Sequence, residues 1–136
     1  MVGLSVTAVL TLIATPNIQQ IIDRAQVKSA RTTAFNRLSA ARLAAQHGGR
    51  LVVFKVSGGR IWTEAYPRLV AAFGSSRDTL GPVTDLVGQY GLNMSTTVDS
   101  IVFDPRGLGT GTGMIRLTRG ASTDSVFVTG LGNVVR

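Results

Sequence analysis

The sequence predicts an α+β protein in which a long N-terminal helix packs on a small antiparallel β-sheet domain. Two observations support this. Asn17 to Gln46 is dominated by Gln, Ala, Arg and Leu, which are strong helix formers. Beyond Gly49 the chain changes to short runs of β-branched and aromatic residues joined by glycine-containing links. We therefore expect an apolar helical segment over residues 1–16, an amphipathic helical arm over 17–48 and a β-rich head over 49–136.

The first segment, Val2 to Ala14, carries no charge and is shorter than the about 20 residues that a membrane-spanning helix needs. No basic region precedes it and no small-residue cleavage site follows it, so a cleavable secretory signal fits poorly. Two interpretations remain: a buried core helix, or a spanning helix that has lost its first residues. Continuation into a long polar helix favours the second. The residues expected to pack in a membrane or filament are Leu4, Val6, Val9, Leu10, Leu12, Ile13, Pro16, Ile18, Ile21 and Ile22.

Pro16 stands at the border between the apolar half and the polar half of this helix. A proline inside a helix removes one backbone N–H and disturbs the preceding turn. At a boundary with water this costs less, because the freed carbonyl groups can be solvated, and the helix gains a place to bend.

The apolar positions of the arm change face along its length. At about 100° per residue, Ile18, Ile21, Ile22 and Ala25 share one side of the helix. A second stripe lies nearly opposite and comprises Val27, Ala30, Ala34, Leu38, Ala41 and Ala45. We expect the second stripe to cover the protein's own sheet and the first to need another partner, such as a neighbouring subunit. The alternative is that a bend at Pro16 makes this projection unreliable.

The head should begin with a β-hairpin, in which "RLVVFKV" and "RIWTE" flank Ser57-Gly58-Gly59. Residues 67–91 mix short apolar runs with glycine and proline, and are expected to form loops with one short strand or helical turn. Four further strands are predicted at Val98–Phe103, Met114–Arg119, Ser125–Gly130 and Asn133–Arg136. Trp62 and Tyr66 could belong either to the core or to the sheet surface.

No catalytic or metal-binding constellation is evident. The chain has no cysteine, which excludes disulfides and thiol chemistry, and its single histidine, His47, is expected at a helix C-terminus. The glycine-rich stretch "GLGTGTG" is followed by a strand-like segment and not by a helix, so we expect a hairpin loop and no phosphate cradle. The sequence therefore predicts a protein that is not an enzyme and has no cofactor, metal or small-molecule substrate.

The sequence carries an excess of positive charge. Fourteen basic residues against seven acidic ones give a formal charge of +7, which favours encounters with nucleic acid or anionic lipid. Arg24, Lys28 and Arg31 form a stripe on the arm, which is either a solvated face or a contact with lipid phosphates or an acidic neighbour. Arg116, Arg119 and Arg136 are candidate nucleic-acid contacts near the C-terminus. We expect DNA binding to be weak, nonspecific and salt-sensitive.

The order of these parts resembles the GspH/FimT family of type IV pilin-like proteins. The resemblance rests on "ATPNIQQII", on "NRLSAARLAAQHGGRLVVF", and on "VFDPRGLGTGTGMIRL" followed by "SVFVTGLGNVVR". It implies a minor pseudopilin or minor pilin, anchored in the bacterial inner membrane with its head outside the cytoplasm. Such a protein assembles through its N-terminal helix, with other pilin-like subunits and components of the assembly machine, into the pseudopilus of type II secretion or a type IV pilus.

The start of the chain departs from this family pattern. It is expected to begin a few residues inside the family helix, without the basic leader and without the glutamate that the family uses in docking. Two alternatives to the assembly role remain. One is a DNA-binding minor pilin that serves natural transformation, and the other is a soluble accessory domain with a buried first helix.

Overall fold

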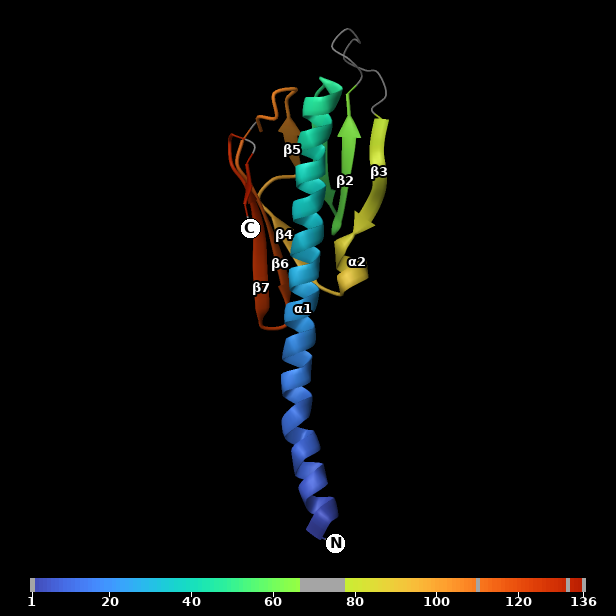
Figure 1. Cartoon of the computed structure of the whole chain (residues 1–136), viewed down its shortest axis with the longest axis vertical. Helices are drawn as coiled ribbons and strands as arrows, with labels where there is room; N and C mark the ends of the chain where they lie inside the picture. The colour runs from blue at the N-terminus through green and yellow to red at the C-terminus, as the bar shows by residue number, and fades with distance from the viewer. Residues whose placement is uncertain (1, 67–77, 110, 132, 136) are drawn as a thin grey trace.

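The computed structural model describes residues 2–66, 78–109, 111–131 and 133–135, with side chains from residue 18 onward except that of residue 78. The fold is α+β, as the sequence predicts (Figure 1). The long helix α1 (Val2–Gly48) runs the length of the head and extends beyond it at the N-terminal end. It is followed by β1 (Val52–Ser57), β2 (Arg60–Ala65), β3 (Asp78–Asp85), α2 (Leu86–Tyr90), β4 (Asn93–Thr96), β5 (Ser100–Phe103), β6 (Gly113–Arg119), β7 (Ser122–Val128) and β8 (Val134–Val135).

The described strands form two four-stranded sheets, where the sequence had suggested one small sheet. The first, sheet A, has the order β3-β2-β1-β5, and the second, sheet B, has the order β4-β6-β7-β8. All strand pairs are antiparallel. In Figure 1, α1 crosses in front of both sheets, with β2 and β3 on its right and β7 on its left.

One core joins α1 to both sheets. Among the described side chains of α1, six are at most 3% exposed and form its inner face: Val27, Ala30, Ala34, Leu38, Ala41 and Ala45. Phe54 and Ile61 of sheet A pack in the same cluster as Leu117 and Val126 of sheet B. Four of the six helix residues are alanines, whose small side chains let the helix axis approach the sheets closely. The predicted second stripe is therefore confirmed as the face that packs on the head.

The predicted hairpin is confirmed as β1–β2, with strand ends that differ by at most two residues from those expected. Ser57 pairs with Arg60, which leaves a two-residue turn of Gly58 and Gly59 with φ of 58° and 78°. Positive φ at both positions is typical of a type I′ turn, which suits glycine. A Cβ on Gly59 would also overlap the side chain of Val87, so the turn packs directly on α2.

Several other boundaries differ from the prediction. The ambiguous stretch contains both a strand, β3, and a short helix, α2, while residues 67–77 lie outside the described part of the chain. Strand β4 was not predicted, because "NMST" has no apolar alternation. The prediction that "GLGTGTG" forms a hairpin loop is wrong. Strands β5 and β6 belong to different sheets, so this loop is a crossover between sheets.

Helix α1 continues through Pro16 and ends at Gly48, and Gly49 adopts a φ of 59° that terminates it, as predicted. His47 lies exposed in its last turn. Taking about 1.5 Å per residue, the part from Val2 to Ile22 is about 30 Å long. Within the described residues, no helix has an apolar stretch long enough to cross a membrane.

Candidate assembly surface on helix α1

The exposed apolar face of α1 lies on the part that leaves the head. Ile18, Ile21 and Ile22 are 55%, 65% and 39% exposed, whereas Val27, which follows Ile22 after four intervening residues, is 3% exposed. The prediction that only the second stripe covers the head is thus confirmed for the described side chains, and a separate partner for the first stripe stays a prediction. The side chains of the other predicted packing residues lie outside that set: Leu4, Val6, Val9, Leu10, Leu12, Ile13 and Pro16.

An ion pair holds α1 where it leaves the head. The Nε of Arg119, on β6, donates to Asp23 Oδ1 at 2.9 Å, and the two side chains are 26% and 13% exposed. A second nitrogen of Arg119, Nη1, donates to the carbonyl oxygen of Tyr90 at 2.6 Å. Arg119 therefore links α1, α2 and sheet B, a structural engagement that competes with the predicted nucleic-acid contact.

A second ion pair joins α1 to β7. Arg31 Nη1 lies 2.5 Å from Asp124 Oδ2, and the Arg31 side chain is 20% exposed. Arg31 thus differs from Arg24 and Lys28, which are exposed and have no carboxylate partner in the described part of the chain. Arg116 is exposed on the outer face of β6, while Arg136 lies outside the described residues.

Three hydrogen bonds complete the polar seam between α1 and the head. Thr33 Oγ1 and the Tyr90 hydroxyl are 2.8 Å apart. Further along the helix, Arg42 Nη1 donates to Asn133 Oδ1 at 3.2 Å, and Gln46 Nε2 donates to the Arg106 carbonyl oxygen at 3.2 Å. Together with the two ion pairs, these contacts tie the helix to the head along most of the shared length.

Asp104 organises the turn that receives the C-terminal end of α1. Its Oδ1 accepts hydrogen bonds from the N–H groups of Arg106 and Leu108, each at 2.9 Å. The N–H of Leu108 is the largest cause that lowers the pKa of the Asp104 carboxyl; burial acts in the opposite direction, and Arg106 lowers the pKa further. Gly107, with a φ of 82°, has no space for a Cβ because Gln46 occupies it.

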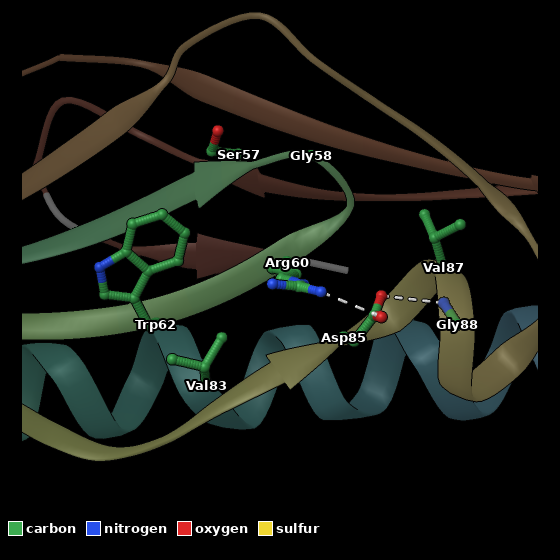
Figure 2. Close-up of a pocket in the computed structure, with 8 residues that line it drawn as sticks. All are labelled: Ser57, Gly58, Arg60, Trp62, Val83, Asp85, Val87 and Gly88. Carbon is green, nitrogen blue, oxygen red and sulfur yellow. Dashed lines mark hydrogen bonds and ion pairs between the residues drawn. The ribbon is translucent and has the colours of Figure 1, made fainter.

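A separate open hollow lies on the outer face of sheet A, and Figure 2 shows the residues that line it. Trp62 lies on this surface, partly buried, and its Nε1 donates to Glu64 Oε1 at 2.9 Å. This settles the position of Trp62, while Tyr66 is partly buried just after β2. Opposite Trp62, the edge strand β3 bulges between Leu80 and Thr84, which leaves Val83 53% exposed.

The described residues that line the hollow form no catalytic constellation. Asp85 accepts from the N–H of Gly88 at 2.9 Å and caps α2, and its Oδ2 lies 3.9 Å from Arg60 Nε (Figure 2). No nucleophile and base face each other among the lining residues that Figure 2 draws. Among the described residues, no group of three His, Cys, Asp or Glu side chains could hold a metal ion.

Solved structures share this architecture. The type IV minor pilin FimU of Pseudomonas aeruginosa (strain PAO1) superposes with a TM-score of 0.66 at 16% identity, over 85% of this chain and 90% of that one. A second crystal form of FimU superposes with a TM-score of 0.61. The chain has the fold of a minor pilin. The minor pseudopilin EpsH from the Type 2 Secretion System of Vibrio cholerae superposes with a TM-score of 0.62 at 13% identity, over 81% of this chain and 94% of EpsH.

The likeness to FimU and EpsH is one of structure. No protein-family model matches the chain, and no curated protein matches it by sequence. At identities of 13–16%, the superpositions establish the shared minor-pilin fold and leave the role of the chain to be argued from its own surface.

Sequence reasoning missed the acidic partners that fix the helix to the head. Asp23 is the only acidic residue of α1, and Asp124 is the only one of β7. A single carboxylate within a basic helix is a usable signal that a partner cation lies elsewhere. It does not reveal that Arg119 is that cation, because the two residues are 96 positions apart.

Proposed function

We propose that this protein is a non-enzymatic minor subunit of a pilin-like filament, either a pseudopilus or a type IV pilus, and that it assembles through α1. The observation that carries the proposal is the exposed face of Ile18, Ile21 and Ile22 on a helix that extends beyond its own head. Monomeric proteins rarely leave such a cluster without a partner. The fold shared with FimU and EpsH supports the same role.

The free energy for assembly would come from burying this face among the helices of neighbouring subunits. Each fully buried isoleucine contributes about 1.5–3 kcal/mol, so a few contacts suffice for a reversible association. Before assembly, the uncharged stretch Val2–Ala14 would lie in the inner membrane with the head outside the cytoplasm. The Asp23–Arg119 pair would keep the head in one orientation relative to the helix, so that each added subunit presents the same surface.

Single-cysteine crosslinking tests the proposal cleanly, because the chain has no cysteine of its own. In the native host, Ile21→Cys labelled with a maleimide–benzophenone reagent, whose irradiated benzophenone inserts into nearby C–H bonds, should give an adduct with another filament subunit. Val83→Cys is the matched control, since Val83 is 53% exposed but lies on sheet A, away from the helix. Equal crosslinking of the two variants, or an Ile21→Cys chain that stays a free monomer, would refute the assembly role.

Weak binding to DNA is a second candidate property. It is favoured by Arg24, Lys28 and Arg116, which are exposed and lack a carboxylate partner among the described residues. Arg24 and Lys28 lie on α1 and Arg116 on the outer face of sheet B, so they do not make one continuous track for a phosphate backbone. We expect nonspecific binding whose logarithmic salt slope is about −0.9 per phosphate contacted, to be measured by a salt titration with duplex DNA.

A further inference from the structure

Strand β7 has an edge that is only partly covered. Strand β8 pairs with β7 at Phe127 and Val128 alone, so Ser122–Val126 of β7 has no neighbouring strand on that side in the described part of the chain. Figure 1 shows β7 at the left border of the head. An open edge presents backbone N–H and C=O groups that can pair with another extended chain.

Exposed apolar side chains gather around the same edge. A groove of about 500 Å³ lies between α1 and β8, lined by Phe35, Ser39, Arg42, Leu43, Gln46 and Val134. On the outer face of sheet B, Phe127 and Val135 pair directly across β7 and β8 and are 40% and 47% exposed. Leu43 is 52% exposed and Leu131, in the β7–β8 turn, is 66% exposed. Half of the eight large apolar side chains found exposed in the described residues thus surround the C-terminal strand.

The helix side that borders this edge is basic. Arg24, Arg31 and Arg42 are spaced by seven and eleven residues and project within about 20° of one another around the helix axis. Arg31 contacts Asp124 and Arg42 contacts Asn133, but the Nε atoms of both are buried without an acceptor in the described structure. Because a guanidinium has five N–H donors, both groups keep donors for a further acceptor.

We propose that the edge of sheet B formed by β7 and β8, with the basic side of α1, docks an extended acidic segment of a different polypeptide. The segment adds a strand to sheet B. Its acidic side chains face Arg31 and Arg42, and its apolar side chains on the opposite face lie beside Phe127 and Val135. The inference goes beyond filament packing by α1, because it assigns a binding groove to the head and its test needs no filament.

Charge decides which partner fits. Strands β7 and β8 contain one carboxylate, Asp124, which already pairs with Arg31, and the chain carries a formal charge of +7. A second copy of this chain would bring positive charge to a positive surface, so a copy of itself is disfavoured. A nucleic acid would use the arginines but neither the strand edge nor the four exposed apolar side chains. An acidic polypeptide uses all three features.

The test is a titration of the full-length chain with a labelled eight-residue peptide of alternating Glu and Val, followed by fluorescence anisotropy. Three comparisons accompany it: the same peptide N-methylated at alternate backbone nitrogens, an alternating Lys-Val peptide, and duplex DNA as a competitor. The acidic peptide should bind at least tenfold more tightly than either other peptide. Amide hydrogen exchange at Thr123–Val126 should slow in the complex, because an added strand protects the edge.

A matched pair of variants locates the site. Leu43→Glu places a negative charge beside Arg42 and should weaken peptide binding at least tenfold, whereas Val83→Glu, at nearly the same exposure on sheet A, should leave binding within twofold. Both positions are exposed, so both variants should fold. Equal binding of the N-methylated or the Lys-Val peptide would overturn the proposal. So would displacement of the peptide by equimolar DNA, an unchanged affinity of Leu43→Glu, or absence of binding at millimolar peptide.

Discussion

Asp23 on α1 and Arg119 on β6 meet at 2.9 Å where the long helix leaves the head, although 96 positions separate them in sequence. The hairpin turn that follows Arg119 brings Gly120 against the same carboxylate. The β6–β7 turn of sheet B therefore contacts α1 at Asp23, and the part of the helix before Asp23 extends beyond the head.

Replacing Arg119 by alanine should lower the free energy of unfolding by about 1.5–3 kcal/mol, the usual range for hydrogen bonds to a charged group. The variant loses the bonds to Asp23 and to the Tyr90 carbonyl together, and leaves the carboxylate without its cation. Urea denaturation measures the effect. Arg116→Ala, an exposed position on the same strand, should change stability by less than about 0.5 kcal/mol. Similar values for the two variants would show that the ion pair contributes nothing.

Gly120→Ala should cost more than about 1 kcal/mol of unfolding free energy, because Gly120 has a φ of 58° that other residues rarely adopt. A Cβ there would also lie 2.5 Å from Asp23 Oδ2. Gly111→Ala is the control, since Gly111 has open space around its Cβ position. Thermal denaturation of both variants should show a clear drop in Tm for Gly120→Ala alone.

Leu38→Ala should destabilise the head by about 2–5 kcal/mol, because Leu38 is fully buried between α1 and the sheets and truncation leaves a cavity. Leu43→Ala removes the same atoms from a side chain that is 52% exposed and should have an effect below about 0.5 kcal/mol. Chemical denaturation of the two variants compares the inner and outer sides of one helix. A small loss for Leu38→Ala would contradict the assignment of the core.

Deletion of residues 1–22 should give a soluble, monomeric fragment that unfolds cooperatively. The deletion removes Ile18, Ile21 and Ile22 but keeps Asp23 and, among the side chains that the structure describes, every buried one of α1. The new helix would begin at Asp23, whose carboxylate favours an N-terminus. Sedimentation and calorimetry provide the measurement. Aggregation of the fragment, with a full chain that is soluble without detergent, would mean that the first part of the helix belongs to the core.

Asp104 should make stability depend on pH in the acid range. Its pKa is lowered from the ordinary value of 3.8 in the folded protein, chiefly by the Leu108 N–H, so the unfolded chain binds this proton more readily. The stabilisation is therefore complete above pH 3.8 and is lost as the pH falls through the lower pKa of the folded state. Unfolding free energies of the wild type and Asp104→Asn, measured from neutral to strongly acidic pH, should differ at neutral pH and converge on acidification. A difference that stays constant would contradict this role.

Local signals predicted the helix and its two faces well. The 3.6-residue periodicity that places Val27 and Leu38 inside and Ile21 outside is a property of consecutive residues, and so are the glycine turn at Gly58 and the helix end at Gly49. The division into two sheets could not be read in this way. Short glycine-containing links look alike whether they close a hairpin, as after Arg119, or cross between sheets, as after Phe103.

The candidate site was predicted only in part, because local periodicity shows which side of the helix is apolar but not which distant residues lie near it. The exposure of Ile18, Ile21 and Ile22 can be predicted, because these residues lie on the side of the helix opposite to the stripe that packs on the head. The spacing of the basic residues does not show which of them form ion pairs. Arg31 and Arg119 have partners that only the tertiary fold brings near, whereas Arg24 belongs to the same sequence stripe as Arg31 and has no such carboxylate in the described structure.

The polar contacts between α1 and the head are spread from Asp23 to Gln46, a span of about 35 Å parallel to the helix axis. A pulling force on the extending end of α1 acts along this seam and loads it in shear. Ion pairs, hydrogen bonds and the apolar core then share the tension, and no single contact yields first. A force that lifts the helix sideways from its Gln46 end meets the contacts one at a time. The head should therefore withstand traction along the helix far better than peeling across it.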